Sequence, residues 1–122
     1  MTELDATPWP SELRLEAGGA RLHVAFDNGE THTLDAEYLR VESPSAEVRG
    51  HGPGQEVTVP GKRNVTITGL EPVGNYAVRI LFSDGHSSGL YAWSYLLKLG
   101  GERDILWPAY VEKLEAEGLS RD

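Results

Sequence analysis

The strongest strand signal in the chain is the stretch Tyr76-Ala77-Val78-Arg79-Ile80-Leu81-Phe82. Its even-numbered residues are apolar and are predicted to share one face of a strand, while its odd-numbered residues share the other. β-Branched and aromatic residues of this kind favour strands. An Asp84-Gly85 turn follows directly, so we expect this strand to be central in a sheet that hairpins connect.

Strand-like alternation recurs on both sides of this stretch. The segments that show it are residues 13–17, 22–26, 31–34, 57–59 and 65–70. Asn28-Gly29 suits the type I′ turn of a hairpin, and residues 71–75 are predicted to form another turn. Residues 42–55, which are rich in Ser, Pro and Gly, are predicted to form a long loop.

Helices are predicted in three short segments. Asp35 is expected to cap a helix over residues 36–40, and Gly100-Gly101 is expected to close a helix over residues 91–99. The last helix has an apolar stripe between Ile105 and Leu114 that should pack on the sheet, with Pro108 in its first turn. The pattern therefore predicts an α+β fold, with a mainly antiparallel sheet built from hairpins and two or three short helices.

Length and charge limit the possible functions. With 122 residues the chain suits a single domain, and 11 Lys and Arg against 19 Asp and Glu give a net charge of -8, which disfavours nucleic acid as a partner. Without Cys, neither a disulfide nor a thiolate metal site can form. The sequence shows neither a secretory signal nor a membrane-spanning apolar run, so we expect a cytoplasmic protein without a membrane partner.

Several motifs occur in an order that points to a known family. They are Leu39-Arg40, the segment 43–47 (Ser-Pro-Ser-Ala-Glu), the segment 71–77 (Glu-Pro-Val-Gly-Asn-Tyr-Ala) and the segment 82–93, which runs from Phe82 to Trp93. Residues 10–100 thereby resemble the gamma-butyrobetaine hydroxylase N-terminal-domain-like family, whose small members are largely without an assigned function. We expect an N-terminal arm over residues 1–10, the family domain over 11–100 and a C-terminal helical extension over 101–122.

The resemblance also implies what this chain should lack. In the hydroxylases, the domain precedes an iron and 2-oxoglutarate oxygenase domain and holds zinc through three Cys and one His. His86 matches the His, whereas Ser43, Ser45 and Val48 replace the cysteines. Neutral hydroxyls and a Val cannot replace thiolates, so we expect neither that zinc site nor any other cofactor, and no oxygenase activity. A related domain is attached to iron–sulfur cluster carriers, and by analogy the resemblance implies an accessory role in iron–sulfur assembly or delivery.

The turn after the central strand carries the candidate site. Its proposed binding residues are Asp84, His86, Ser87, Tyr91, Trp93 and Arg79. We expect the His86 ring to project from the hairpin end, where Asp84, Ser87 or Ser88 forms a hydrogen bond with one ring nitrogen. Arg79 is expected to form an ion pair with Glu71 or Asp84. For His86, the favoured interpretation is a local structural role beside the turn, and the alternative is a contact to a ligand or the remnant of a metal ligand.

The nearby aromatic side chains allow two interpretations. Tyr76, Tyr91, Trp93 and Tyr95 could line an apolar groove for a partner. The favoured interpretation is that Tyr76 and Trp93 instead pack a helix against the sheet. A hydrolase based on Asp84, His86 and Ser87 is disfavoured, because the members of a catalytic triad normally come from separate elements.

Three functional hypotheses follow from these residues. The leading one is a non-enzymatic accessory domain that engages a protein partner through the surface from Asp84 to Trp93, with a link to iron or iron–sulfur metabolism. The second is a weak metal site made by His86 with Asp84 and Glu47. The third, an enzyme in its own right, requires a pocket with at least two convergent ionisable groups.

Overall fold

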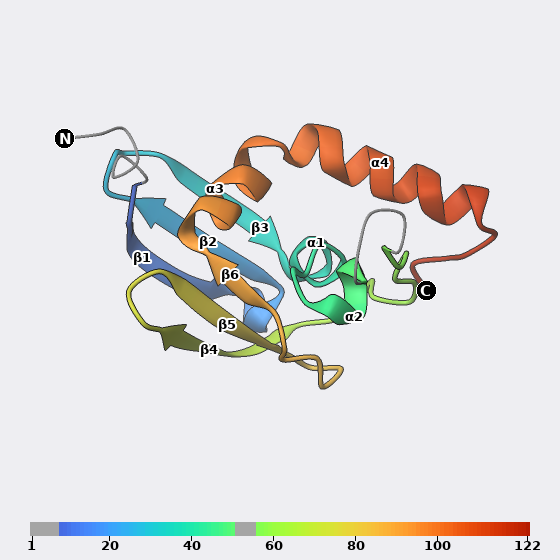
Figure 1. Ribbon diagram of the computed structural model, residues 1–122, viewed down its shortest axis with the longest axis horizontal. Coiled ribbons are helices and arrows are strands. Elements are labelled where there is room, and N and C mark those ends of the chain that lie inside the picture. The colour runs from blue at the N-terminus through green and yellow to red at the C-terminus, as the bar shows by residue number, and fades with distance from the viewer. Residues whose placement is uncertain (1–7, 51–55) are drawn as a thin grey trace.

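The computed structural model describes residues 8–50 and 56–122. Two antiparallel three-stranded sheets form its framework, with the strand orders β1-β2-β3 and β4-β5-β6. The strands are β1 (Pro10–Glu16), β2 (Arg21–Phe26), β3 (Thr31–Asp35), β4 (Ile67–Val73), β5 (Ala77–Phe82) and β6 (Leu90–Ala92). The helices are α1 (Ala36–Val41), α2 (Ala46–Arg49), α3 (Trp93–Gly101) and α4 (Arg103–Ala116), and the short 3-10 turn η2 (Ala17–Gly19) joins β1 to β2. This architecture confirms the α+β prediction (Figure 1).

The strongest sequence signal lies where it was expected. β5 is the central strand of its sheet and pairs antiparallel with β4 and β6. Val78, Ile80 and Phe82 are buried in one core cluster with Leu22 and Val24 of β2. The predicted Asn28-Gly29 turn joins β2 to β3, but it is not of type I′, because Gly29 has a positive φ of 91° and Asn28 does not.

The two sheets share a core and approach each other closely at η2. Side chains from both sheets and from α1 and α3 belong to the same buried cluster. Gly19 lies so close to β4 that a Cβ there would be 2.2 Å from the carbonyl oxygen of Ile67. Because Gly19 also has a φ of 93°, only glycine suits this position.

Some boundaries differ from the prediction for identifiable reasons. β4 continues through Pro72, where a turn was predicted, because β4 is an edge strand and a missing N–H on its unpaired side costs no ladder bond. The turn falls instead at residues 74–76, so Tyr76 is exposed. Residues 57–59 do not form the predicted strand, although Val59 is buried and its carbonyl accepts the Tyr110 hydroxyl.

The helical predictions also need corrections. Residues 90–92 form β6, so α3 begins only at Trp93, and it continues through both glycines that were expected to cap it. Asp35 precedes α1, but its side chain makes no capping hydrogen bond. The predicted loop contains α2, which Ser45 caps by accepting a hydrogen bond from the Glu47 N–H. Residues 51–55 of that loop and residues 1–7 of the arm lie outside the described residues.

The last helix packs on other helices instead of on the sheet. Tyr110 and Leu114 of α4 form a second buried cluster with Val41, Val48 and Val59. Pro108 lies in the helix interior, beyond the first turn that was predicted for it. In Figure 1, α4 accordingly runs along the side of the molecule that carries α1 and α2.

Candidate functional site

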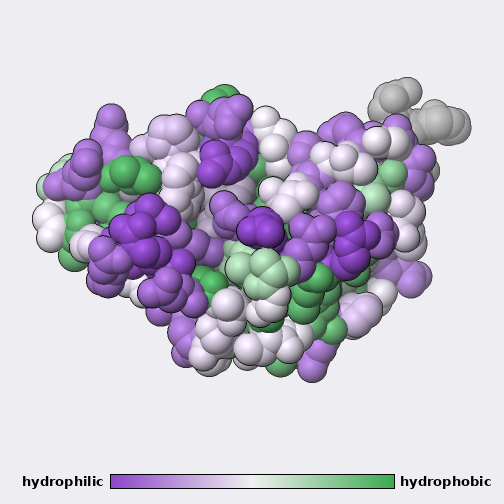
Figure 2. All heavy atoms as spheres, turned by 180° about the vertical axis from the view of Figure 1, so that it is seen from behind, coloured by the Kyte–Doolittle hydropathy of each residue, from purple (hydrophilic) through white to green (hydrophobic). Residues whose placement is uncertain are grey.

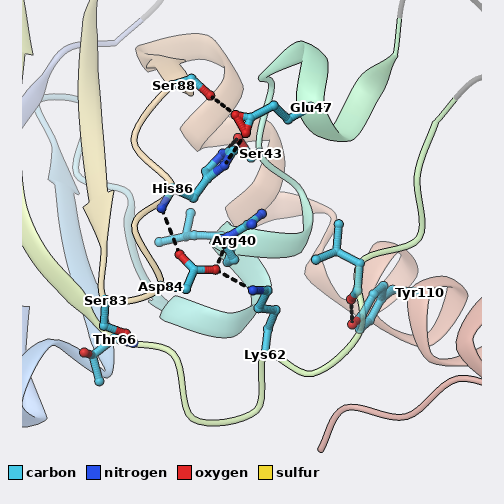
Figure 3. Close-up of polar contacts among 12 residues, drawn as sticks. Arg40, Ser43, Glu47, Lys62, Thr66, Ser83, Asp84, His86, Ser88 and Tyr110 are labelled. Atoms are coloured by element: carbon cyan, nitrogen blue, oxygen red, sulfur yellow. Dashed lines mark hydrogen bonds and ion pairs between the residues drawn. The ribbon is translucent and has the colours of Figure 1, made fainter.

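The loop between β5 and β6 lies against the segment that connects α1 to α2. The Asp84-Gly85 turn is closed by a hydrogen bond from the Gly85 N–H to the Phe82 carbonyl, and Gly85 has a φ of 91°. The Asp84 carboxylate then accepts the backbone N–H of His86 at 3.0 Å. These local bonds direct the His86 side chain toward the α1–α2 segment (Figure 3).

The His86 ring is buried, so the prediction that it projects from the hairpin end is wrong. Its side chain is only 2% exposed. Nε2 lies 2.9 Å from Ser43 Oγ, and Nδ1 lies 3.5 Å from a Glu47 carboxylate oxygen. Burial is the largest cause that lowers the pKa of His86, and the Arg40 charge adds to it, while Glu47 and Asp84 oppose the shift. The neutral ring therefore connects the loop to the segment that leads into α2.

Asp84 belongs to a separate ionic network. Its carboxylate contacts Arg40 Nε at 2.8 Å and Lys62 Nζ at 2.6 Å. Burial by itself would raise the pKa of Asp84, but hydrogen bonds from Lys62, the His86 backbone and Arg40 hold that pKa well below its ordinary value. Asp84 thus connects the loop to α1 and to the segment before β4.

The four positions that the resemblance assigned to zinc ligands come only partly together. Ser43 contacts His86, and Ser45 Oγ lies 2.7 Å from Ser88 Oγ, whereas Val48 is buried in the apolar cluster under α4. Within residues 8–50 and 56–122, no group of three or more His, Asp and Glu residues could hold a metal. Of the weak metal site that the sequence suggested, only the contact between His86 and Glu47 is present. The Asp84 carboxylate contacts Arg40 and Lys62 instead.

Ser43, His86 and Glu47 are connected in the order of a hydrolytic triad. The sequence interpretation had considered Ser87, which is exposed, and missed Ser43. Ser43 is fully buried, and a Cβ on Gly89 would be 2.5 Å from its Oγ, so the loop covers the hydroxyl completely. In this closed arrangement, no substrate can reach the Ser43 oxygen.

The other candidate residues do not form one surface. Tyr91 is fully buried, burial raises its pKa, and its hydroxyl donates to the Leu39 carbonyl at 2.5 Å. Arg79 pairs with Glu71 at 3.4 Å, which decides between the two partners that were expected. The Trp93 indole N–H donates to the Asn75 carbonyl at 2.9 Å. Tyr91 therefore belongs to the core, and only Trp93 leads to an exposed feature.

That feature is a group of three aromatic residues, Trp9, Tyr76 and Trp93, which we call the aromatic patch. Together with Asn75, Ala92 and Ser94 they surround a hollow of about 240 Å³. Tyr76 is 59% exposed and Trp9 is 52% exposed. The prediction that Tyr76 packs a helix against the sheet is therefore wrong. Tyr76 is exposed because the turn between β4 and β5 extends to residue 76, one residue further than the sequence pattern predicted.

A second hollow contains ionisable side chains that bind one another. It has a volume of about 270 Å³ and is lined by Glu42, Arg49, Tyr95 and Lys98, with Leu99 and Leu106. Arg49 donates to the Glu42 carboxylate at 2.8 Å and to the Tyr95 hydroxyl at 2.6 Å. Burial of the phenol raises the pKa of Tyr95. These contacts hold α2 against α3.

The rest of the visible surface is mostly polar. Figure 2 shows hydrophilic side chains over much of one face, with hydrophobic residues in separate spots. Within the described part of the chain, no helix has the length and apolar character needed to cross a bilayer. The aromatic patch combines three large aromatic side chains around one hollow, which is a composition typical of contact surfaces.

Comparison with protein families confirms the resemblance. Residues 13–97 match the family described as gamma-butyrobetaine hydroxylase-like, N-terminal. This chain belongs to that family, and α4 follows the matched region. No curated protein matches the chain.

Solved structures with the same fold are similar to this chain over most of its length. Two proteins determined by NMR in solution are similar to this chain, with 46% identity and a TM-score of 0.83 for one and 43% and 0.82 for the other. The alignments cover 99% and 95% of this chain, and 90% and 91% of those chains. A crystal structure from Acidithiobacillus ferrooxidans is 37% identical with a TM-score of 0.61, over 75% of this chain and 91% of that chain. It is described as a protein of unknown function in the DUF971 family.

Proposed function

We propose that this protein is a non-enzymatic accessory domain that binds a protein partner through the aromatic patch. The observation that supports the proposal is the exposure of Trp9 and Tyr76 beside Trp93 around one hollow. Trp and Tyr are the residues most enriched at the energetic centres of protein interfaces, because each contributes a large apolar face at little cost in conformational entropy.

The proposed contact surface lies at the Trp93 end of the segment from Asp84 to Trp93 that the sequence suggested. His86 and Tyr91 are buried, and Asp84 is held by two cations, so these side chains shape the loop from within. Trp93 remains part of the contact surface, and it is joined there by Tyr76 and Trp9. The resemblance of the chain to domains attached to iron–sulfur carriers supports a partner that acts in iron or iron–sulfur metabolism.

Affinity capture with matched variants tests this proposal. The wild-type protein, a Trp9→Ser/Tyr76→Ser double variant and an Ile105→Ser control would each be immobilised and exposed to host lysate. Ile105 is a matched control because it is 67% exposed and lies on α4. We expect the wild type and the control to retain a partner that the double variant loses. That partner should also bind the purified wild-type protein directly.

Two results would contradict the proposal. One is recovery of the same proteins by all three forms, provided that the double variant has a native-like NMR spectrum. The other is turnover of a substrate by the purified protein alone, which would favour the enzyme hypothesis instead.

A further inference from the structure

The backbone segments that carry the aromatic patch, and the Trp93 indole, are held in place by internal contacts. The Trp93 backbone N–H donates to the Tyr76 carbonyl at 3.0 Å, and its indole donates to Asn75. The Tyr76 ring lies against Gly74, where a Cβ would be 3.0 Å from the ring. The Trp9 N–H donates to the Asp27 carboxylate at 3.2 Å, and the Trp9 carbonyl accepts the Asp27 N–H at 2.8 Å. Binding would therefore order few additional groups.

The three rings provide separate faces instead of a closed cage. They come from the start of β1, the β4–β5 turn and the start of α3. The ring contacts among the described residues join other aromatic side chains, and none joins two members of the patch. Spaced faces around a shallow hollow suit an extended peptide, whose successive side chains can lie between the rings.

Hydrogen-bond donors remain at the exposed ends of two of the rings. The Trp93 indole N–H is used internally, but the Tyr76 hydroxyl and the Trp9 indole N–H have no hydrogen-bond partner among the described residues. A polyproline II segment has no internal hydrogen bonds, so its carbonyls are free to accept from such donors. Its proline rings pack on aromatic faces, and its extended form is already largely ordered before binding.

The charge beside the patch is negative. Asp27 is bonded to the Trp9 backbone, and Glu30 follows in the same β2–β3 turn. The chain has neither Lys nor Arg between Arg21 and Arg40. We propose that the aromatic patch binds a proline-rich, extended segment of a partner that carries Arg or Lys on the side facing Asp27. This inference rests on the proposed function and specifies the partner's chemistry.

NMR titration with three synthetic peptides tests the proposal on the intact chain. The first peptide has about ten residues, mostly Pro, with two Arg at one end. The second has Glu in place of Arg, and the third keeps Arg but has Ala and Ser in place of Pro. We expect chemical-shift changes at residues 74–76 and 92–94 with the first peptide, at least about tenfold weaker binding of the third, and intermediate or weaker binding of the second.

Variants of the protein then locate the site. Tyr76→Ser and Trp9→Ser should each weaken binding of the first peptide about tenfold, whereas Ile105→Ser should leave it unchanged. Asp27→Asn retains an oxygen that can accept the Trp9 N–H while removing the charge, so it should reduce the preference for Arg over Glu without abolishing binding. Added salt should reduce the same preference, because the charges are exposed.

The outcomes separate this inference from the function on which it rests. If the proline-free peptide binds as well as the first, or if no peptide shifts the patch, the proline-rich partner is wrong. A patch-dependent partner from the capture experiment would then leave the proposed function standing with a partner of different chemistry. Loss of patch dependence in both experiments would overturn both proposals.

Discussion

At the scale of single residues, His86 shows how a side chain that looks like a ligand can serve the fold. Its ring is enclosed by Ser43 and Glu47 and lies near the Arg40 charge. A buried neutral imidazole loses stability when it must accept a proton. The sequence could not distinguish this role from an exposed one, because the contacts of His86 come from residues about 40 positions earlier.

This environment predicts a pH dependence of stability. Because the pKa of His86 is lowered in the folded protein, its contribution should be complete above the unfolded-state value of about 6.5 and be lost as the pH falls through the lower folded-state value. NMR titration of the ring should give a pKa below 6.5, and urea unfolding should show a smaller loss of stability in His86→Gln than in the wild type between pH 7 and about pH 5. A ring pKa at or above 6.5 would contradict this account.

Gly89 tests how closely the loop lies on Ser43. A Cβ on Gly89 would be 2.5 Å from Ser43 Oγ, whereas a Cβ on Gly69 would be 3.9 Å from its nearest neighbour, Leu81. Gly89→Ala should therefore destabilise the protein by about 2 kcal/mol, and Gly69→Ala should change the stability by less than about 1 kcal/mol. Chemical denaturation measures both values. Equal effects of the two substitutions would mean that the loop is not closely packed on Ser43.

At the scale of elements, the C-terminal segment fastens α4 to the rest of the molecule. Residues Gly61 and Arg63 donate backbone hydrogen bonds to Ser120 and Arg121. Arg121 donates to both oxygens of Glu37 at 2.7 and 2.6 Å and lies over the ring of Trp107. The Glu37 side chain is 7% exposed and is paired with Arg121 from the far end of the chain.

Removal of the Arg121 side chain would leave that carboxylate buried and unpaired. Arg121→Ala should lower the free energy of unfolding by about 3 kcal/mol. The matched control is Arg63→Ala, which removes an exposed ion pair with Asp122 and should cost less than about 1 kcal/mol. Urea unfolding of both variants measures the difference. Similar small losses in both would mean that the pair with Glu37 adds little to stability.

At the scale of the whole molecule, the positions that the resemblance assigned to zinc ligands carry groups that contact other parts of the protein. Ser43 and Ser45 carry neutral hydroxyls that bond to His86 and Ser88, and Val48 packs under α4. We predict that protein purified without chelator contains no stoichiometric zinc and that dialysis against chelator leaves its melting temperature unchanged, because hydroxyls cannot supply the binding energy of thiolates. Elemental analysis that finds one firmly held zinc per chain would contradict this prediction.

The sequence by itself determined the α+β class, the central strand β5, the Asn28-Gly29 hairpin and the family, because each depends on alternation, on backbone preference or on short motifs read locally. Only the tertiary structure decided that Tyr91 and His86 are buried, that Tyr76 joins Trp9 and Trp93 at one hollow, and that α4 covers α1 and α2. The physical reason is that burial and side-chain partners depend on residues far apart in the chain. A shift of one residue in a strand end also changes which side chains face the solvent.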